Sequence, residues 1–227
     1  MNRTNAVQVL LQNFDNAYGY DLTVTDESAT VQDYLDALNH AIEEYSLTRS
    51  RKKVSSCQGC ELCCAERAPL TAIDLFNIKA YLKVSDETLQ KTLDQIGYVV
   101  VNGPAVDITL RRGEDERCVF LGRKNKLCSI YSARPLVCQT FICCPSSTKA
   151  ARLKEIIVNY GEDELVRQWL VQASEKGGAP GFHEGIRPKI NIKDWKPNVF
   201  SAKRNYREVT IKEISPPNLW KQLYKHR

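Results

Sequence analysis

The residues of this chain best suited to chemistry are its nine cysteines, all of which lie between Cys57 and Cys144. The first four form the run Cys57-Gln-Gly-Cys60-Glu-Leu-Cys63-Cys64. Two-residue spacing lets successive thiolates turn around one centre, and it serves both zinc sites and iron–sulfur loops. Because the count is odd and no export signal is evident, we expect metal binding rather than a disulfide framework.

A second group of cysteines follows after a long gap. A zinc ion or one iron–sulfur cubane takes four thiolates, so eight or nine cysteines exceed one such site. In extended backbone the adjacent Cys63 and Cys64 would point to opposite faces, which makes it hard for both to bind one ion. The sequence therefore predicts two four-thiolate sites or one multinuclear centre. The second group consists of Cys118, Cys128, Cys138 and Cys143, with Cys144 directly after it.

The sequence predicts more strongly that a metal is bound than which metal it is. Thiolate coordination fits zinc, iron–sulfur clusters and Cu(I). All three histidines lie outside the cysteine region, which disfavours mixed Cys/His zinc sites. The ferredoxin-like triple spacing favours an iron–sulfur cluster as cofactor, with zinc as the alternative. A lone cysteine is often a small buried apolar residue, and for Cys144 that interpretation is as good as metal binding.

Arg134 and Tyr131 lie among the cysteines and could support a cluster from outside its ligand shell. A thiolate cluster is net negative, so a nearby guanidinium can offset its charge and donate hydrogen bonds to sulfur, and the Tyr131 hydroxyl can donate similarly. The alternatives are a turn residue for Arg134 and core packing for Tyr131.

A symmetric hairpin with its turn around residue 123 would place Cys118 and Cys128 opposite each other.

These residues resemble the CxxCxxCC cysteine-cluster family, also called YkgJ-like proteins, whose name refers to zinc or iron chelation. The resemblance covers about residues 55–145 and includes the signature Tyr131-Ser-Ala-Arg134-Pro135-Leu-Val-Cys138. It implies an iron–sulfur protein, for example with a 4Fe-4S cluster, and it leaves Cys144 as an extra cysteine. A similar module occurs in flagellin lysine N-methylases. The metal ligands that the resemblance implies are Cys57, Cys60, Cys63, Cys64, Cys118, Cys128, Cys138 and Cys143.

Hydrophobic patterning predicts an α-rich α+β fold, with helices around a small metal-stapled cysteine core and one or two β-hairpins. Val7, Leu10, Leu11 and Phe14 have the spacing of one helix face, and a second helix should start at Thr30. Further helices are expected after Thr71 and Ser85, with strands at 98–101 and 106–110. The expected parts are an N-terminal helical segment (1–50), the cysteine domain (55–145), two C-terminal helices that break near Tyr160 (146–176) and a basic, aromatic-containing tail (182–227).

The positive net charge of +5 arises from the C-terminal part, where ten Lys or Arg outnumber three Asp or Glu between Lys189 and Arg227. Basic residues interleaved with aromatic ones can bind single-stranded nucleic acid. We favour the alternative, in which these aromatic side chains pack back on the core. Nucleic acid is thus a less favoured partner than protein. The aromatic residues are Trp195, Phe200, Tyr206, Trp220 and Tyr224.

Composition excludes several broad classes. With 43% hydrophobic and 26% charged residues, the chain is neither disordered nor collagen-like. No apolar run approaches the ~18 residues of a membrane span, and the stretch Ala6–Leu11 is too short for a signal peptide. We expect a soluble, cytoplasmic protein.

Three function classes remain. The first is an iron–sulfur protein with a redox or accessory role, the second a zinc-binding structural or interaction module, and the third a cluster-bearing modification enzyme. No carboxylate pair is placed for acid–base catalysis and no histidine is placed to activate a cysteine, so we identify no catalytic residues. We expect a binding protein rather than an enzyme. An enzyme would be an oxidoreductase or a protein methyltransferase.

Overall fold

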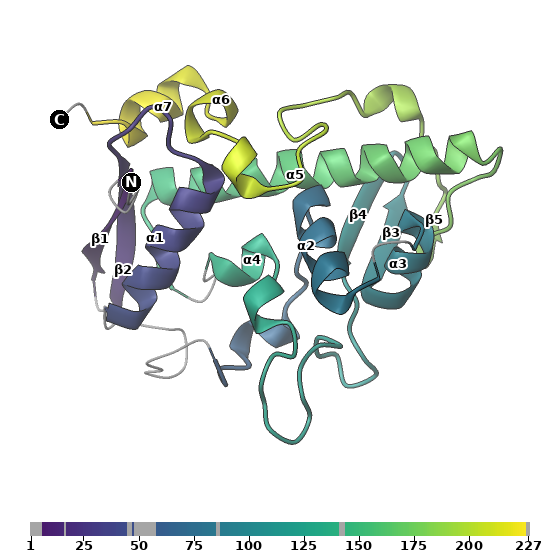
Figure 1. The fold of residues 1–227 in the computed structure, drawn as a ribbon, viewed down its shortest axis with the longest axis horizontal. Coiled ribbons are helices and arrows are strands. Elements are labelled where there is room, and N and C mark those ends of the chain that lie inside the picture. Colours follow the sequence, from purple (N-terminus) through teal and green to yellow (C-terminus); the bar gives the residue numbers. More distant parts are fainter. Residues whose placement is uncertain are drawn as a thin grey trace.

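The computed structural model describes residues 6–15, 17–44, 47, 58–84, 87–140 and 144–225. A long helix, α5 (Thr148–Glu175), crosses the molecule and joins two groups of elements (Figure 1). The cysteine segments and the short helix α4 (Leu136–Gln139) lie between the two groups, on one side of α5 (Figure 1). Helices and two small sheets make up the fold, which confirms the predicted α-rich α+β class.

The N-terminal segment begins with a β-hairpin, so the helix predicted from Val7 to Phe14 is wrong. Strand β1 (Val7–Phe14) pairs antiparallel with β2 (Ala17–Val24) in a continuous register. Val7 and Val9 are buried whereas Leu10 and Leu11 are exposed, so burial in β1 does not follow a helix face. Spacing alone left helix and strand ambiguous in this short apolar run, and pairing with β2 decided the outcome.

The first hydrophobic core joins this hairpin to α1 (Val31–Glu44), which begins where the sequence predicts. Thr30 and Asp33 form a capping box, because each side chain accepts a hydrogen bond from the backbone N–H of the other residue. Two short C-terminal helices, α6 (Ile211–Ile214) and α7 (Pro217–Leu223), contribute to the same core. Its largest fully buried side chains include Tyr20, Leu22, Tyr34, Leu35, Phe200 and Tyr206.

The second core lies at the other end of α5 and contains the predicted strand pair. Strands β3 (Gly97–Asn102) and β4 (Ala105–Leu110) form an antiparallel hairpin, and β5 (Glu184–Ile186) pairs parallel to β3. Helices α2 (Ala72–Leu82) and α3 (Leu89–Ile96) pack beside them. Thr88, not Ser85, caps α3. Ser85 itself lies outside the described residues.

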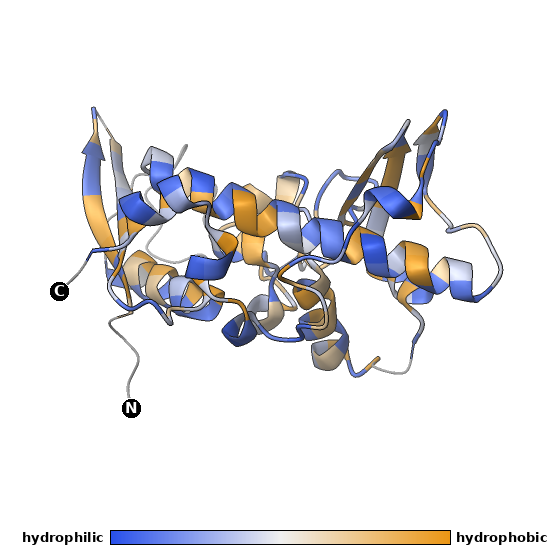
Figure 2. Ribbon diagram, turned by 90° about the horizontal axis from the view of Figure 1, so that it is seen from above, coloured by the Kyte–Doolittle hydropathy of each residue, from blue (hydrophilic) through white to orange (hydrophobic). Residues whose placement is uncertain are grey.

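Helix α5 is continuous where the sequence predicts two helices. The break was expected near Tyr160, next to Gly161. In the fold, Gly161 is buried and faces α2, where a Cβ atom would lie 2.5 Å from the Thr71 side chain. The glycine therefore allows two elements to approach closely instead of ending the helix. Along α5, hydrophobic and hydrophilic residues alternate as it passes both cores (Figure 2).

The C-terminal segment packs on the body of the protein, as the favoured interpretation of its aromatic residues predicts. Phe200 and Tyr206 are at most 1% exposed and belong to the first core. Because they are buried, these two rings are not available to stack on nucleic-acid bases. Within the described residues, no helix is both long and apolar enough to cross a membrane.

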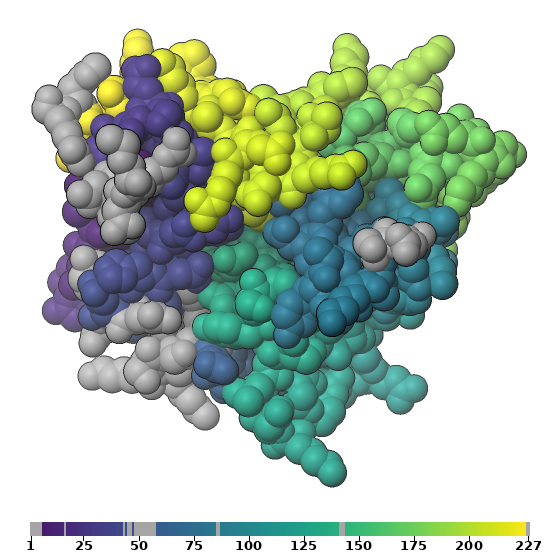
Figure 3. All heavy atoms as spheres, in the orientation of Figure 1, coloured from purple at the N-terminus to yellow at the C-terminus, as the bar shows by residue number. Residues whose placement is uncertain are grey.

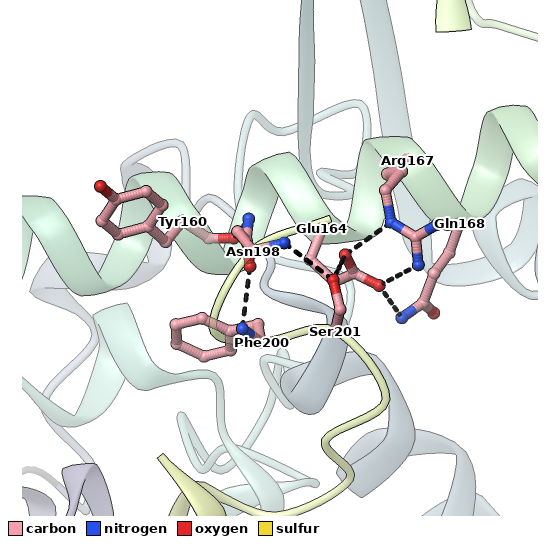
Figure 4. A network of polar contacts seen from close by, with 7 residues as sticks. All are labelled: Tyr160, Glu164, Arg167, Gln168, Asn198, Phe200 and Ser201. Atoms are coloured by element: carbon pink, nitrogen blue, oxygen red, sulfur yellow. Dashed lines mark hydrogen bonds and ion pairs between the residues drawn. The ribbon is translucent and has the colours of Figure 1, made fainter. Parts of the chain in front are cut away.

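A buried carboxylate anchors this segment to α5. The Glu164 side chain is fully buried, and its two oxygens accept hydrogen bonds from the Arg167 guanidinium, each at 2.7 Å (Figure 4). The Ser201 hydroxyl donates to Glu164 at 2.6 Å, and the Asn198 side chain donates to the Tyr160 carbonyl oxygen at 2.8 Å (Figure 4). These contacts hold the chain on α5 just before it continues to Tyr206.

We expect Glu164→Gln to lower the free energy of unfolding by about 1–3 kcal/mol, because it removes a buried charge that is fully hydrogen-bonded. Denaturant unfolding of the full chain measures this. The control is Glu155→Gln on the same helix, which removes an exposed ion pair with Arg152 and should cost less than about 0.5 kcal/mol. Equal losses in both variants would contradict the anchoring role of Glu164.

Glu162 provides a pH-dependent contribution to stability. Its carboxylate accepts a hydrogen bond from the Ile108 N–H at 2.9 Å, and burial raises its pKa to about 7. In the unfolded chain the Glu162 carboxyl ionises near pH 4.5, whereas in the folded chain it stays protonated up to about pH 7. Glu162 therefore destabilises the fold progressively as the pH rises from 4.5 to 7. Glu162→Gln should therefore stabilise the protein by about 1–3 kcal/mol at pH 8.

The same substitution serves as its own control at low pH. At pH 4 the wild-type carboxyl is mostly protonated in both states, so the Gln variant should gain little there. Urea titrations at pH 4 and pH 8 make the comparison. A gain of equal size at both pH values would show that the effect does not come from ionisation of Glu162.

Candidate metal centre

Six of the predicted ligands line one pocket of about 50 Å³. They come from three separate segments: the turn around η1 (Leu62–Ala65), the loop after β4, and α4. In Figure 3 the loop after β4, coloured teal, reaches the lower edge of the molecule. Cys57 and Cys143 lie outside the described residues. The six cysteines are Cys60, Cys63, Cys64, Cys118, Cys128 and Cys138.

Hydrogen bonds to backbone carbonyl oxygens join the first cysteine segment to the second. The Cys118 N–H donates to the Cys64 carbonyl oxygen at 2.8 Å, and the Arg112 guanidinium donates to the Ala65 carbonyl oxygen at 3.2 Å. Arg112 also forms an antiparallel bridge with Cys118. The carbonyl of Cys64 is thus used to hold Cys118 next to the first run, so the two segments have one fixed relative position.

An ion-pair network reinforces the same junction. Glu61, between Cys60 and Cys63 in sequence, contacts the Arg117 guanidinium at 2.7 Å and the Lys126 ammonium at 3.1 Å. Each ion pair is partly exposed and alone contributes little to stability. The Glu61 carboxylate nevertheless contacts two residues of the same loop and so attaches that loop to the first cysteine run. Glu61 is not among the site residues predicted from the sequence. Its charge within the cysteine run was the signal that could have identified it.

The loop between Cys118 and Cys128 has a different register from the predicted hairpin. Leu121, not Cys118, is bridged to Cys128, and the Gly122 N–H donates to the Leu127 carbonyl oxygen at 2.8 Å. The predicted direct opposition of the two cysteines is therefore wrong. Local side-chain chemistry explains the shift, because the Asn125 side chain accepts from the Leu127 N–H and tightens the turn further along. Both cysteines nevertheless line the pocket.

Cys63 is the central thiol of the group. The thiols of Cys138 and Cys64 hydrogen-bond to its sulfur, which lowers the pKa of Cys63 and raises the pKa of both donors. Burial raises the pKa of Cys118 and Cys128. A metal ion bound here would have to displace the protons of most of these thiols, because metal binding requires deprotonated sulfur, and it would then compensate the negative charge.

Arg134 and Tyr131, which the sequence predicts to support a cluster from outside its ligand shell, also line the pocket. The Arg134 guanidinium lies 4.1 Å from the centre of the Tyr131 ring and donates to the Tyr131 carbonyl oxygen at 3.3 Å. It donates to the Asn39 side chain at 2.6 Å. Asn39 comes from α1 and no sequence signal linked it to the site. These contacts hold one positive charge beside the thiols.

Cys144 has a different environment from the other described cysteines. It is 8% exposed and belongs to the first hydrophobic core, and it is not among the residues that line the pocket. This placement agrees with the interpretation of Cys144 as a buried apolar residue rather than a ligand.

The donor set of the pocket fits a thiophilic metal. Among the described residues, however, no three His, Cys, Asp or Glu side chains are arranged closely enough to hold an ion. Six sulfurs nevertheless border one small pocket, and all six described thiols there are free of disulfides. Soft thiolates select zinc, Cu(I) and iron–sulfur clusters over hard cations.

Comparison with known proteins agrees with this chemistry. Residues 56–161 match the model of the CxxCxxCC family, described as "Putative zinc- or iron-chelating domain", so this part of the chain is similar to that family. The chain is 36% identical over 85 residues to the uncharacterized protein MJ0661 of Methanocaldococcus jannaschii. This similarity covers 37% of the chain, which spans about two fifths (41%) of that relative. No solved structure matches.

We expect Arg134→Gln to raise the pKa of Cys63 and Cys128, because the Arg134 charge lowers both. The pH profile of alkylation in the metal-free protein, followed by mass spectrometry, measures each thiol. Arg123→Gln is the matched control, since Arg123 acts on Cys118 instead. If Cys63 responds equally to both substitutions, the specific role of Arg134 is wrong.

Proposed function

We propose that this chain is an iron–sulfur protein whose cluster is bound by thiolates of the CxxCxxCC domain. The observation that carries the proposal is the convergence of six thiols from three chain segments on one pocket. Two further cysteines adjoin these segments in sequence and complete the set of eight. The proposed ligands are Cys57, Cys60, Cys63, Cys64, Cys118, Cys128, Cys138 and Cys143.

The number and type of donors support iron–sulfur chemistry over a single zinc ion. Zinc in a structural site is complete with four ligands, and more than four thiols surround this pocket. No histidine is among the described residues that line it. Clusters take cysteine thiolates from C-x2-C-x2-C runs and a distant fourth position, which is the pattern of Cys57, Cys60 and Cys63 with the later segments.

The surroundings of the pocket would tune such a cluster. Hydrogen bonds to sulfur, nearby charge and solvent exposure set the reduction potential of iron–sulfur centres. Arg134 supplies a positive charge at the pocket, and Ile130 and Leu110 line it with apolar surface. We infer a redox or accessory role, in which a cytoplasmic protein with reduced thiols acts together with a protein partner.

Anaerobic purification of the full chain should yield a brown protein with iron and acid-labile sulfide. Cys128→Ser should lose most of both, because it removes a pocket thiol. Cys144→Ser is the matched control: it should keep the metal content and lose about 1 kcal/mol of stability from polar burial in the first core. Iron, zinc and sulfide quantitation measures all three proteins.

Each outcome of this experiment is informative. A colourless protein with zinc and no sulfide would replace the iron–sulfur proposal by the zinc-binding module. A wild-type protein that retains no metal, or a Cys144→Ser variant that loses metal as fully as Cys128→Ser, would contradict the proposed ligand set.

A further inference from the structure

A buried polar group connects the C-terminal segment to the cysteine pocket. Tyr206, in the short helix η4 (Tyr206–Glu208), donates its hydroxyl proton to Asp74 Oδ1 at 2.7 Å. The same hydroxyl lies 2.6 Å from Thr71 Oγ1. All three residues are at most 1% exposed. A hydrogen-bonded group at this depth has few alternative arrangements, because water cannot replace a missing partner.

Asp74 uses its two oxygens for two different helices. Oδ2 accepts from the Thr71 N–H at 3.0 Å and so completes the capping box of α2. Oδ1 accepts from the Leu136 N–H at 2.8 Å, the first residue of α4. The N-cap of α4 is Pro135, which offers no side-chain acceptor, so a carboxylate 62 positions away in sequence holds the start of this helix.

The start of α4 determines where Cys138 lies. The helix has only four residues, and Leu136 and Cys138 belong to the same turn. Cys138 lines the pocket and hydrogen-bonds to Cys63. A shift of the Leu136 backbone would therefore move the Cys138 sulfur relative to the other thiols.

We propose that Tyr206 is a positioning residue for the metal ligand Cys138 and acts through Asp74. This inference rests on the proposed function, in which Cys138 is a ligand. Tyr206 lies outside residues 56–161, so the metal-binding domain of this chain uses a contact from its C-terminal segment. The ring of Tyr206 packs in the first core, edge-on to Phe200 at 6.5 Å, and its hydroxyl makes the polar contacts with Thr71 and Asp74.

Tyr206→Phe isolates the hydroxyl, because it keeps the ring and its packing. Val209→Ala is the matched control: Val209 is fully buried in the same segment and core, and its shortening lowers stability without touching the polar group. If the Tyr206→Phe chain does not fold, Asp74→Asn weakens the same contact from its acceptor side, because it removes the charge that accepts from the Tyr206 hydroxyl and keeps the size of the side chain.

The first readout needs no metal. In the metal-free full chain, alkylation of each cysteine is followed by mass spectrometry. We expect Cys138 to react about tenfold faster in Tyr206→Phe, which is the effect of one lost buried hydrogen bond, with Cys128 within about twofold of wild type. In Val209→Ala, the two cysteines should change together or not at all.

The second readout is the thiolate-to-cobalt absorption after anaerobic addition of Co²⁺. Its wavelength or intensity should change in Tyr206→Phe and remain as wild type in Val209→Ala. Unchanged alkylation of Cys138, or a parallel rise at Cys128, would overturn the positioning role. Wild-type protein that takes up neither Co²⁺ nor iron would instead contradict the proposed function, and the alkylation result would still stand on its own.

Discussion

The structure depends on one constraint: thiols from three separate chain segments must share one pocket. Thiols close together resist ionising, since each new negative charge is repelled by its neighbours and penalised by burial. Such a pocket is stable only if the surrounding chain holds the segments together or a cation compensates the charge. The Cys64 carbonyl, the Glu61 carboxylate and the Arg134 guanidinium each contribute to holding it.

The two hydrophobic cores explain how those segments are kept in place. Helix α5 packs in both cores and fixes the distance between them, while α4 and the cysteine turns occupy the region between (Figure 1). The second core borders the pocket through Ile130, whereas Leu136 of the first core directly follows the pocket residue Pro135 in sequence. Neither core alone contains the complete pocket, so the long helix supports the cysteine pocket although it contributes none of the six described thiols.

Buried polar groups supply the specificity that apolar packing lacks. Glu164 and Asp74 are both buried acids whose hydrogen bonds join distant parts of the chain. Glu164 anchors the C-terminal segment on α5, and Asp74 receives Tyr206 from that segment a few residues later. Because an unpaired buried carboxylate is costly, each of these contacts favours one arrangement of the chain over alternatives with similar hydrophobic burial.

The sequence by itself determined the chemistry of the site and the elements whose signals are local. Cysteine spacing identified the thiol group, and capping residues such as Thr30 and Thr71 marked helix starts that the structure confirms. Only the tertiary structure decided that residues 7–14 pair as a strand, that Gly161 lies inside a continuous helix, and that Asn39 and Tyr206 support the pocket. The strand at 7–14 depends on pairing with the following strand β2, and the other outcomes depend on partners far away in sequence. The pattern within one segment carries no information about such contacts.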